Sequence, residues 1–271
     1  MTNFTMLKEA VKLIERGEEI ALATVTKASG STPREEGTKM IVLEDGTIYG
    51  TVGGGNLESR VIDESIEALK NGQSFSLYLP LEKEELGMEC GGEVEVFIDV
   101  FKSKPKLLIV GGGHVGLAIY EIASILDFDI TVFEDRQELL AKERFPLAKE
   151  LILGNVEENL SNYPIDENTY IVIVTRGHKY DESCLENVVE SNAKYIGVMG
   201  SKRKVKVMMD SLKKKGIDED LLERVYTPIG LNLGGETPEE IAISIMSEIL
   251  LIKNSGSLIH MKSTRKDNIM L

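Results

Sequence analysis

One stretch decides the fold of this chain: Lys106-Leu-Leu-Ile-Val-Gly-Gly-Gly-His-Val-Gly116. Its apolar part, Leu107 to Val110, is typical of a strand that is buried on both faces of a parallel sheet. The glycines that follow, Gly111, Gly113 and Gly116, have the spacing G-x-G-x-x-G. Apolar residues then return at helical intervals over 117–126. The sequence therefore predicts a strand, a glycine loop and a helix in direct succession.

This succession suits a phosphate for physical reasons. One glycine allows a tight turn, one lets the backbone approach a pyrophosphate, and one lets the helix pack closely on the strand. The N-terminus of the helix then offers unpaired N–H groups to the anion. A second strand, Ile130 to Phe133, ends in Glu134 and Asp135, about 20 residues further on, where a carboxylate binds ribose hydroxyls. We therefore predict a Rossmann-type nucleotide site; the alternative is a fold that has kept the turn without a nucleotide. The predicted cofactor-binding residues here are Gly111, Gly113, His114, Gly116, Glu134, Asp135 and Arg136.

Composition and charge exclude several classes of partner. The chain has 271 residues, of which 42% are hydrophobic and 28% charged, as expected for an ordinary soluble protein of two modest domains. Its net charge of −14 argues against nucleic acid and anionic membranes as main partners. Nothing resembles a signal peptide or a membrane span, so we expect a cytoplasmic protein. Cys90 and Cys184 form no C-x-x-C pair, so neither a disulfide framework nor a zinc knuckle is indicated. Cys184 is expected at the start of a helix, after Asp181 and Glu182, where acidic surroundings should keep its thiol protonated.

The order of predicted elements divides the chain into domains. Residues 1–101 are expected to form a small α+β domain, with an opening helix, a hairpin across Asp45-Gly46 and further strands. The apolar face of the opening helix is expected to contain Leu7, Ala10, Val11 and Ile14, which recur at helical spacing. A polar link ends at Pro105. Residues 106–253 alternate strands with helices, which predicts a doubly wound parallel sheet with its ligand crevice at the carboxyl ends of the strands. The last helix should begin with a capping box, with Thr237 as N-cap and Glu240 at N3. Residues 254–271 lose this periodicity and are expected to form a flexible tail.

Two further loops of the second domain are candidates for ligand contact. Ser201 and Arg203 open a helix after the fifth strand, where N–H groups, a hydroxyl and a guanidinium suit an anion. We predict that both bind cofactor; the alternative is a solvated basic face. His178 follows the fourth strand and is a candidate for catalysis, against the alternative of an ordinary surface histidine.

The first domain adds three candidate places. Ser31 and Arg34 share a loop that contains glycine and proline, and Gly54 and Gly55 precede a helix. Each pair could bind an anionic group of a cofactor, or could only form a tight turn. Cys90 is followed by two glycines, which leave its thiol uncovered. It is therefore a candidate sulfur ligand or sulfur carrier, against the alternative of a small apolar residue.

The motifs of both domains resemble those of one family. Gly30-Ser-Thr-Pro-Arg34, Gly53-Gly-Gly-Asn-Leu-Glu58 and Cys90-Gly-Gly92 look like the amino-terminal motifs of the xanthine dehydrogenase accessory factor (XdhC/CoxI) family. The resemblance then continues in family order through Ile109-Val-Gly-Gly-Gly-His-Val-Gly116, Glu134-Asp-Arg136, Gly197-Val-Met-Gly-Ser-Lys-Arg203, Pro228-Ile-Gly-Leu231 and Glu236-Thr-Pro-Glu-Glu-Ile-Ala242.

The resemblance implies a cytosolic maturation factor for molybdenum hydroxylases. Such a protein receives molybdenum cofactor, protects it while a terminal oxo ligand is exchanged for sulfido, and hands it to the apo-hydroxylase. A cysteine desulfurase and a second copy of the chain are further partners on this interpretation. Two departures stand out: Thr175-Arg176 replaces the usual Thr-His, and Glu134-Asp-Arg136 replaces Asp-Asp-Arg. The first removes a potential ligand or base, whereas the second keeps the charge.

The leading hypothesis is an accessory protein that is more a cofactor chaperone than a turnover enzyme. It would bind molybdopterin, alone or in a dinucleotide form, and Cys90 would bind molybdenum or accept sulfur. Glu134 suits a ribose diol, which bare molybdopterin lacks and a dinucleotide form carries. The alternatives are an NAD(P)-dependent oxidoreductase that uses the same glycine loop, and a Rossmann half that serves only as a docking surface.

Overall fold

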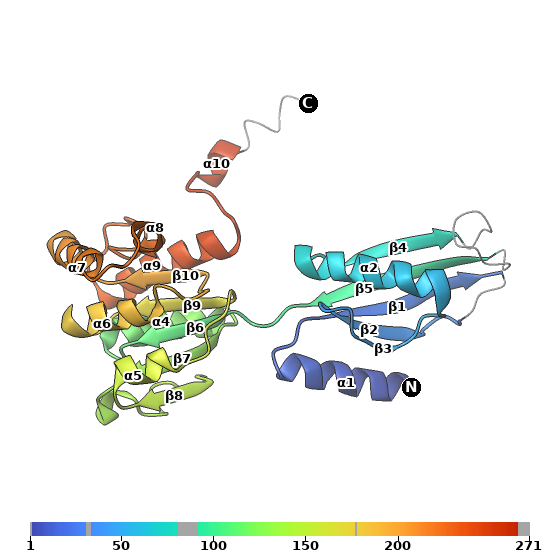
Figure 1. Ribbon diagram of the computed structural model, residues 1–271, viewed down its shortest axis with the longest axis horizontal. Coiled ribbons are helices and arrows are strands. Elements are labelled where there is room, and N and C mark those ends of the chain that lie inside the picture. The colour runs from blue at the N-terminus through green and yellow to red at the C-terminus, as the bar shows by residue number, and fades with distance from the viewer. Residues whose placement is uncertain (1, 31–33, 81–91, 177, 265–271) are drawn as a thin grey trace. The chain divides into compact units, whose positions relative to one another are not determined.

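The computed structural model describes residues 2–30, 34–80, 92–176 and 178–264. The chain divides into two compact units, Met1–Ser103 and Lys104–Leu271, and each is described by itself (Figure 1). No helix within the described ranges is long and apolar enough to cross a membrane.

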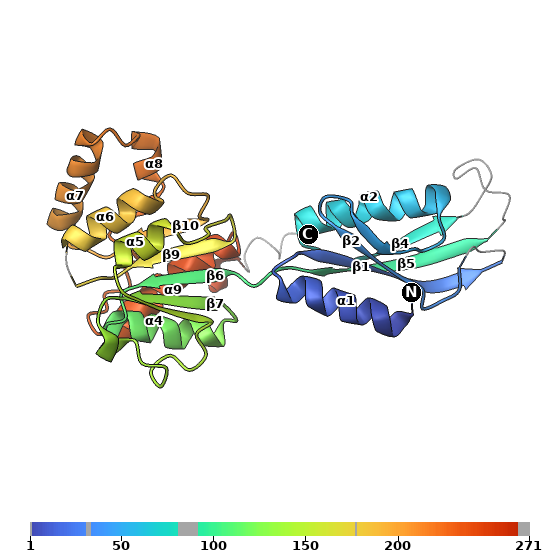
Figure 2. The same cartoon turned by 60° about the horizontal axis from the view of Figure 1, so that its bottom comes forward.

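The first unit is a five-stranded antiparallel sheet with a helix on each face (Figure 2). Its elements are α1 (Asn3–Glu15), β1 (Ile20–Ser29), β2 (Lys39–Leu43), β3 (Ile48–Gly50), α2 (Gly55–Asn71), β4 (Phe75–Pro80) and β5 (Glu93–Phe101). The strand order is β3-β2-β1-β5-β4. Ile20 and Leu22 of β1 pack with α1, and Ala21 and Ala23 pack with α2, because successive strand residues point to opposite faces.

Two features of this unit test the sequence analysis. The hairpin predicted across Asp45-Gly46 is confirmed as β2 and β3, which pair antiparallel. The opening helix is present too, but it buries Met6, Ala10 and Leu13. Apolar residues on the other side of α1, such as Val11, remain exposed. Contact with β1 and β2, and not helical spacing alone, therefore selects the buried face.

The second unit is a six-stranded parallel sheet covered by helices on both faces. Its strands are β6 (Lys106–Val110), β7 (Asp129–Glu134), β8 (Glu150–Leu153), β9 (Thr169–Ile173), β10 (Tyr195–Val198) and β11 (Val225–Tyr226). Its helices are α4 (His114–Ile125), η1 (Gln137–Leu139), α5 (Val156–Ser161), α6 (His178–Val188), α7 (Lys202–Lys214), α8 (Glu219–Glu223), α9 (Pro238–Lys253) and α10 (Met261–Thr264). The strand order is β11-β10-β9-β6-β7-β8, and every paired strand is parallel.

Two apolar cores lie on the two faces of this sheet. One contains side chains of α4 and α9, and the other contains side chains of α5, α6, α7 and α8. The predicted doubly wound parallel sheet is therefore confirmed. Successive strands run outward from β6 through β7 to β8, and outward on the other side from β9 to β11. The connections thus diverge between β6 and β9, and the carboxyl ends of these strands border the crevice where such folds bind ligands.

Candidate functional site

The glycine loop joins β6 to α4, and its glycines differ in the space around them. Gly111 has φ 120°, and a Cβ there would lie 2.7 Å from the carbonyl oxygen of Val174. A Cβ on Gly116 would lie 1.9 Å from the carbonyl oxygen of Gly111, so only glycine lets α4 approach the loop. A Cβ on Gly113 would meet no atom within 4 Å. The loop is therefore tight at both ends and open at Gly113.

The first two N–H groups of the loop are bonded within the protein, whereas the start of α4 has no cap. Gly111 N donates to the carbonyl of Phe133 at 2.9 Å, and Gly112 N donates to Glu134 Oε2 at 2.8 Å. Gly113 is the N-cap of α4 and supplies no side-chain cap. The N–H groups of the first helical turn therefore have no capping side chain, as an anion site requires.

Glu134 lies at the end of β7 and is 2% exposed. Arg136 binds its carboxylate through two atoms, Nε to Oε1 at 2.8 Å and Nη2 to Oε2 at 3.0 Å. Burial alone would raise the pKa of this carboxyl, but hydrogen bonds from Arg136, Asp135 and Gly112 outweigh burial and lower the pKa to about 2. Glu134 is therefore ionised and held by the protein itself.

Asp135 is the acid that remains open to a ligand. Its side chain is 36% exposed, and Arg176 Nη2 lies 3.8 Å from its Oδ2. Its pKa is raised, first by interaction with the Glu134 carboxylate and then by burial. Asp135 lines a cavity of about 280 Å³ together with Gly111, Asn155, Val156, Thr175 and Arg176.

A hollow lined in part by basic side chains lies next to this cavity, at the carboxyl ends of the parallel strands. We call it the basic hollow. Two overlapping cavities of about 350 Å³ share Met199, Gly200, Ser201 and Lys204 in their walls. One of them also shares Thr175 and Arg176 with the cavity beside Asp135. The three cavities therefore adjoin along the edge where the parallel strands end, which we call the carboxyl edge.

The hollow carries cations that the described chain leaves unpaired. Ser201 is the N-cap of α7, and its hydroxyl caps no N–H group. Lys204 and Arg203 make no ion pair with any described residue. The same hollow is lined by two acids that have partners within the protein. Asp181 is 5% exposed and accepts a 2.6 Å hydrogen bond from Thr175 Oγ1, and Glu182 pairs with Lys215 at 3.0 Å. Cations, a hydroxyl and helix N–H groups thus gather at one place, as they do where proteins bind phosphate.

Family models match both units. A model described as the XdhC Rossmann domain matches residues 107–249, and one described as the XdhC and CoxI family matches residues 13–78. This chain belongs to the XdhC and CoxI family. The family identified from the motifs is therefore confirmed.

Similar proteins extend this result. The chain is 37% identical over 255 residues to the uncharacterized protein YqeB of Escherichia coli (strain K12), across 92% of this chain and 46% of YqeB. It is 28% identical over 155 residues to a probable xanthine dehydrogenase subunit of Bacillus subtilis (strain 168), across 57% of this chain and 45% of that protein. The chain therefore spans less than half of the length of these two relatives.

Two further proteins are similar to this chain over nearly the whole length of each compared pair. The molybdenum cofactor insertion chaperone PaoD of Escherichia coli (strain K12) is 22% identical over 289 residues, across 92% of this chain and 88% of PaoD. The crystal structure of a xanthine dehydrogenase from Bacillus halodurans superposes with a TM-score of 0.52 at 20% identity, across 95% of this chain and 97% of that one. At that identity the structural likeness supports the fold alone.

Several candidate residues of the XdhC motifs do not belong to the carboxyl edge of the Rossmann unit. Some lie in the first unit, and others fall outside the described residues. Cys90 and Ser31 fall outside the described residues, and of His178 the structure describes only that α6 begins there. Arg34 and Gly54 belong to the first unit, where Gly54 is the N-cap of α2 with φ 77°. Among the described residues, no group of three or more His, Cys, Asp or Glu could hold a metal ion.

Cys184 differs from its predicted setting. It lies in the middle of α6, not at the start of a helix, and is fully buried in the core. Burial first, and then Glu157 and Asp181, raise the pKa of its thiol to about 12. The thiol is protonated, as its acidic surroundings predict, but burial is the larger cause.

Two arginines at the carboxyl edge, Arg176 and Arg144, are not among the predicted site residues. Arg176 lines two of the three cavities, although the motif comparison noted it only as a departure. Arg144 donates through Nη1 to the carbonyl oxygens of Gly112 at 3.1 Å and Leu139 at 2.6 Å. No sequence pattern marks Arg144, because it follows the second strand in an irregular segment.

Proposed function

We propose that this chain is an accessory factor that binds molybdenum cofactor, supports its sulfuration and delivers it to a xanthine dehydrogenase-type hydroxylase. The observation that carries the proposal is the carboxyl edge of the Rossmann unit, where an uncapped glycine loop and an unpaired basic hollow adjoin. The names of two relatives, a molybdenum cofactor insertion chaperone and a probable xanthine dehydrogenase component, support the same role.

The donor set fits a phosphate-bearing ligand. In a chain of net charge −14, an anion must be held by local donors, and the N–H groups after Gly113 supply them without a competing side chain. The hollow with Ser201, Arg203 and Lys204 would hold a second anionic group. When bound, the cofactor supplies a molybdenum atom with dithiolene and sulfido chemistry; the residues described here bind and orient its polar end.

A dinucleotide form of the cofactor fits the acidic end of the site. The carboxylate of Glu134 already accepts hydrogen bonds from Gly112 and Arg136. We therefore assign ribose binding to the neighbouring Asp135, whose side chain is exposed to the adjoining cavity. Both acids belong to the predicted set, but only Asp135 keeps free acceptor capacity, and Glu134 orders the loop.

Co-purification tests the proposal. We would express the chain in a host that makes molybdenum cofactor, oxidise the purified protein and measure pterin fluorescence. The expected result is pterin at near-stoichiometric level in the parent and its loss in Gly113→Val. Arg224→Gln, altered on the amino side of the same unit, is the matched control and should retain pterin. Nicotinamide without pterin would favour an NAD(P)-dependent oxidoreductase instead.

The role of the thiol needs its own measurement, because Cys90 comes from the motif alone. We propose that Cys90 receives sulfur or binds molybdenum, with a cysteine desulfurase as sulfur donor. Cys90→Ser should fold normally but fail to activate a co-expressed apo-hydroxylase. Cys184→Ala is the control, since a serine at this buried position would add an unpaired hydroxyl to the core. Full hydroxylase activity with Cys90→Ser would exclude the thiol mechanism. Size-exclusion chromatography with light scattering of the parent tests the expected homodimer.

A further inference from the structure

The peptide groups on either side of Gly112 are held from both directions. The Gly112 N–H donates to Glu134 Oε2 at 2.8 Å, and the Gly112 carbonyl accepts from Arg144 Nη1 at 3.1 Å. Glu134 is fixed in turn by Arg136. The residue just before the open glycine of the loop is thus bound to two side chains from different segments.

Arg144 is itself firmly placed. Its Nη1 also donates to the carbonyl of Leu139 at 2.6 Å, and its guanidinium lies 5.4 Å from the ring centroid of Phe145. Phe145 is fully buried and packs edge-on against Tyr120 of α4, with ring centroids 5.0 Å apart. The arginine therefore connects the loop to the helix that begins there.

No described side chain forms an ion pair with Arg144. The charges of Glu134 and Arg136, by contrast, offset each other. A fixed, uncompensated cation next to the loop favours an approaching anion in addition to orienting the peptide.

We propose that Arg144 is a positioning residue of the phosphate-binding loop: it orients the Gly112 peptide so that the N–H groups from Gly113 onward converge on the anion. This inference rests on the proposed function, because it assumes that the loop binds a phosphate group. It adds a residue outside the predicted set and outside the glycine motif. An analogous carbonyl contact, Arg224 Nη2 to Ala193 O at 3.1 Å, lies before β10 and away from the loop, and provides a matched control.

The test compares Arg144→Gln, Arg144→Lys and Arg224→Gln in the full chain. The first measurement needs no ligand: amide hydrogen exchange of Gly112 and Gly113, with the melting temperature of each variant recorded. The second is the affinity for inorganic pyrophosphate, which carries no base or ribose, and for ADP and adenosine.

We expect exchange at Gly112 to accelerate about tenfold or more in Arg144→Gln, with little change in Arg224→Gln. Affinity for pyrophosphate and ADP should fall about tenfold in Arg144→Gln, and adenosine binding should not change. Arg144→Lys should recover part of the affinity, because lysine keeps the charge and N–H donors but loses the planar guanidinium that lies beside the Phe145 ring.

Two results would overturn the inference. One is exchange at Gly112 that is the same in Arg144→Gln and in the parent. The other is an equal loss of pyrophosphate affinity in Arg144→Gln and Arg224→Gln, since that loss would follow general stability. If the parent binds neither pyrophosphate nor ADP, the phosphate site of the proposed function fails, and the exchange measurement still decides whether Arg144 orders the loop.

Discussion

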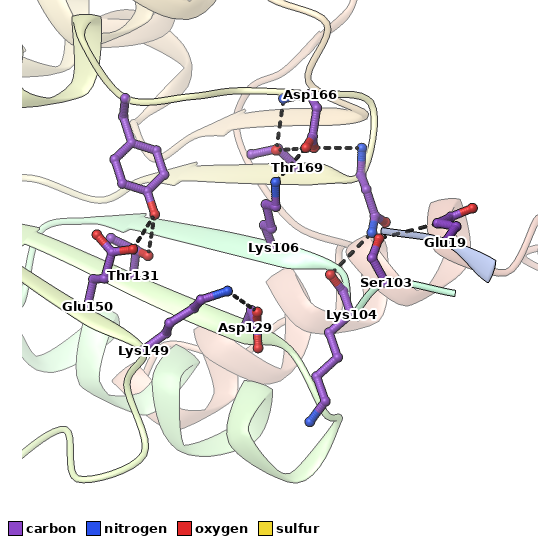
Figure 3. A network of polar contacts seen from close by, with 12 residues as sticks. Glu19, Ser103, Lys104, Lys106, Asp129, Thr131, Lys149, Glu150, Asp166 and Thr169 are labelled. Atoms are coloured by element: carbon purple, nitrogen blue, oxygen red, sulfur yellow. Dashed lines mark hydrogen bonds and ion pairs between the residues drawn. The ribbon is translucent and has the colours of Figure 1, made fainter. Parts of the chain in front are cut away.

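The two edges of the parallel sheet both carry charged side chains but use them differently. At the edge where the strands begin, which we call the amino edge, opposite charges pair closely (Figure 3). Lys106 Nζ lies 2.5 Å from Asp166 Oδ2, and Lys149 Nζ lies 2.5 Å from Asp129 Oδ2. At the carboxyl edge Lys204 and Arg203 have no such partner among the described residues.

The same contrast holds for acids. Asp166 at the amino edge accepts from Lys106 and Thr169 and stays half exposed. Glu134 at the carboxyl edge is buried, and its donors include a loop N–H group. Pairing at the amino edge thus uses surface charges that contribute little to stability. At the carboxyl edge the carboxylate of one ion pair is buried and binds a loop N–H group, and other cations have no ion-pair partner among the described residues. The two ends of one sheet therefore differ in how many of their charged groups the described chain already pairs.

Among the charged residues, the largest expected effect comes from breaking the Glu134–Arg136 pair. Glu134→Ala leaves the Gly112 N–H without its acceptor and leaves Arg136 only Asp135, 3.6 Å away. The loss of unfolding free energy should be about 3 kcal/mol, the lower end for a buried pair, because the Arg136 side chain is 27% exposed. Urea unfolding measures it, with Glu150→Ala at the amino edge as control, because Glu150 makes only a 3.3 Å contact with Tyr163. An equal loss in both variants would remove the contrast between the edges.

The pH dependence of this pair has a definite sign. Arg136 and backbone N–H groups outweigh burial and hold the pKa of Glu134 at about 2, below its ordinary 4.5. A lowered folded-state pKa means that the stabilisation is complete above about pH 4.5 and is lost as pH falls toward 2. The stability difference between parent and Glu134→Ala should therefore shrink across that interval.

The second effect concerns the open glycine. Gly113→Val places a side chain where nothing lies within 4 Å and where the anion should approach. Pyrophosphate affinity should fall about 100-fold, at a stability cost of about 1 kcal/mol or less at this N-cap. Gly116→Val should behave oppositely and disrupt folding, because its Cβ would lie 1.9 Å from a carbonyl oxygen. Calorimetric titration and thermal melts separate the two; unchanged binding in Gly113→Val would place the anion elsewhere.

The fold could be predicted where local pattern and tertiary packing agree. The run Leu107 to Val110 is fully buried, and the predicted capping box of α9 is present, with Thr237 and Glu240 in reciprocal hydrogen bonds. The short helices α5 and α8 could not be predicted from the sequence, because helices of this length depend on burial of single residues such as Leu160 and Leu222. Periodicity in so few residues carries little information.

The site could be predicted only in outline. Spacing indicated that an acid follows the second strand, but it could not show that Arg136 and Gly112 already occupy the carboxylate of Glu134. Nor could it bring Arg144 to the loop, since that contact joins residues 32 positions apart. Which groups remain free for a ligand depends on contacts that a motif does not record.

A smaller effect should come from the basic hollow. Lys204→Glu reverses a cation that makes no ion pair with the described chain, so pyrophosphate affinity should fall about tenfold, or about 1.4 kcal/mol. Lys213→Glu on the same helix is the control, because Lys213 pairs with Glu219 at 2.6 Å away from the cavities. Titration at low and high salt checks the cause, since screening should reduce the difference. Equal losses in both variants would indicate net charge and not a local site.

The smallest effect is expected at the amino edge. Lys149→Met removes a pair whose side chains are 53% and 30% exposed, so the loss of unfolding free energy should stay below about 1 kcal/mol. The hydrogen bond to Asp129 raises the pKa of Lys149 above 10.5, so this contribution is present at neutral pH and is lost only as pH rises through the folded-state pKa. Urea unfolding at pH 7 and pH 11 measures the change, and pyrophosphate affinity should equal that of the parent. A loss above about 2 kcal/mol, or weaker pyrophosphate binding, would show that the amino edge contributes to more than surface pairing.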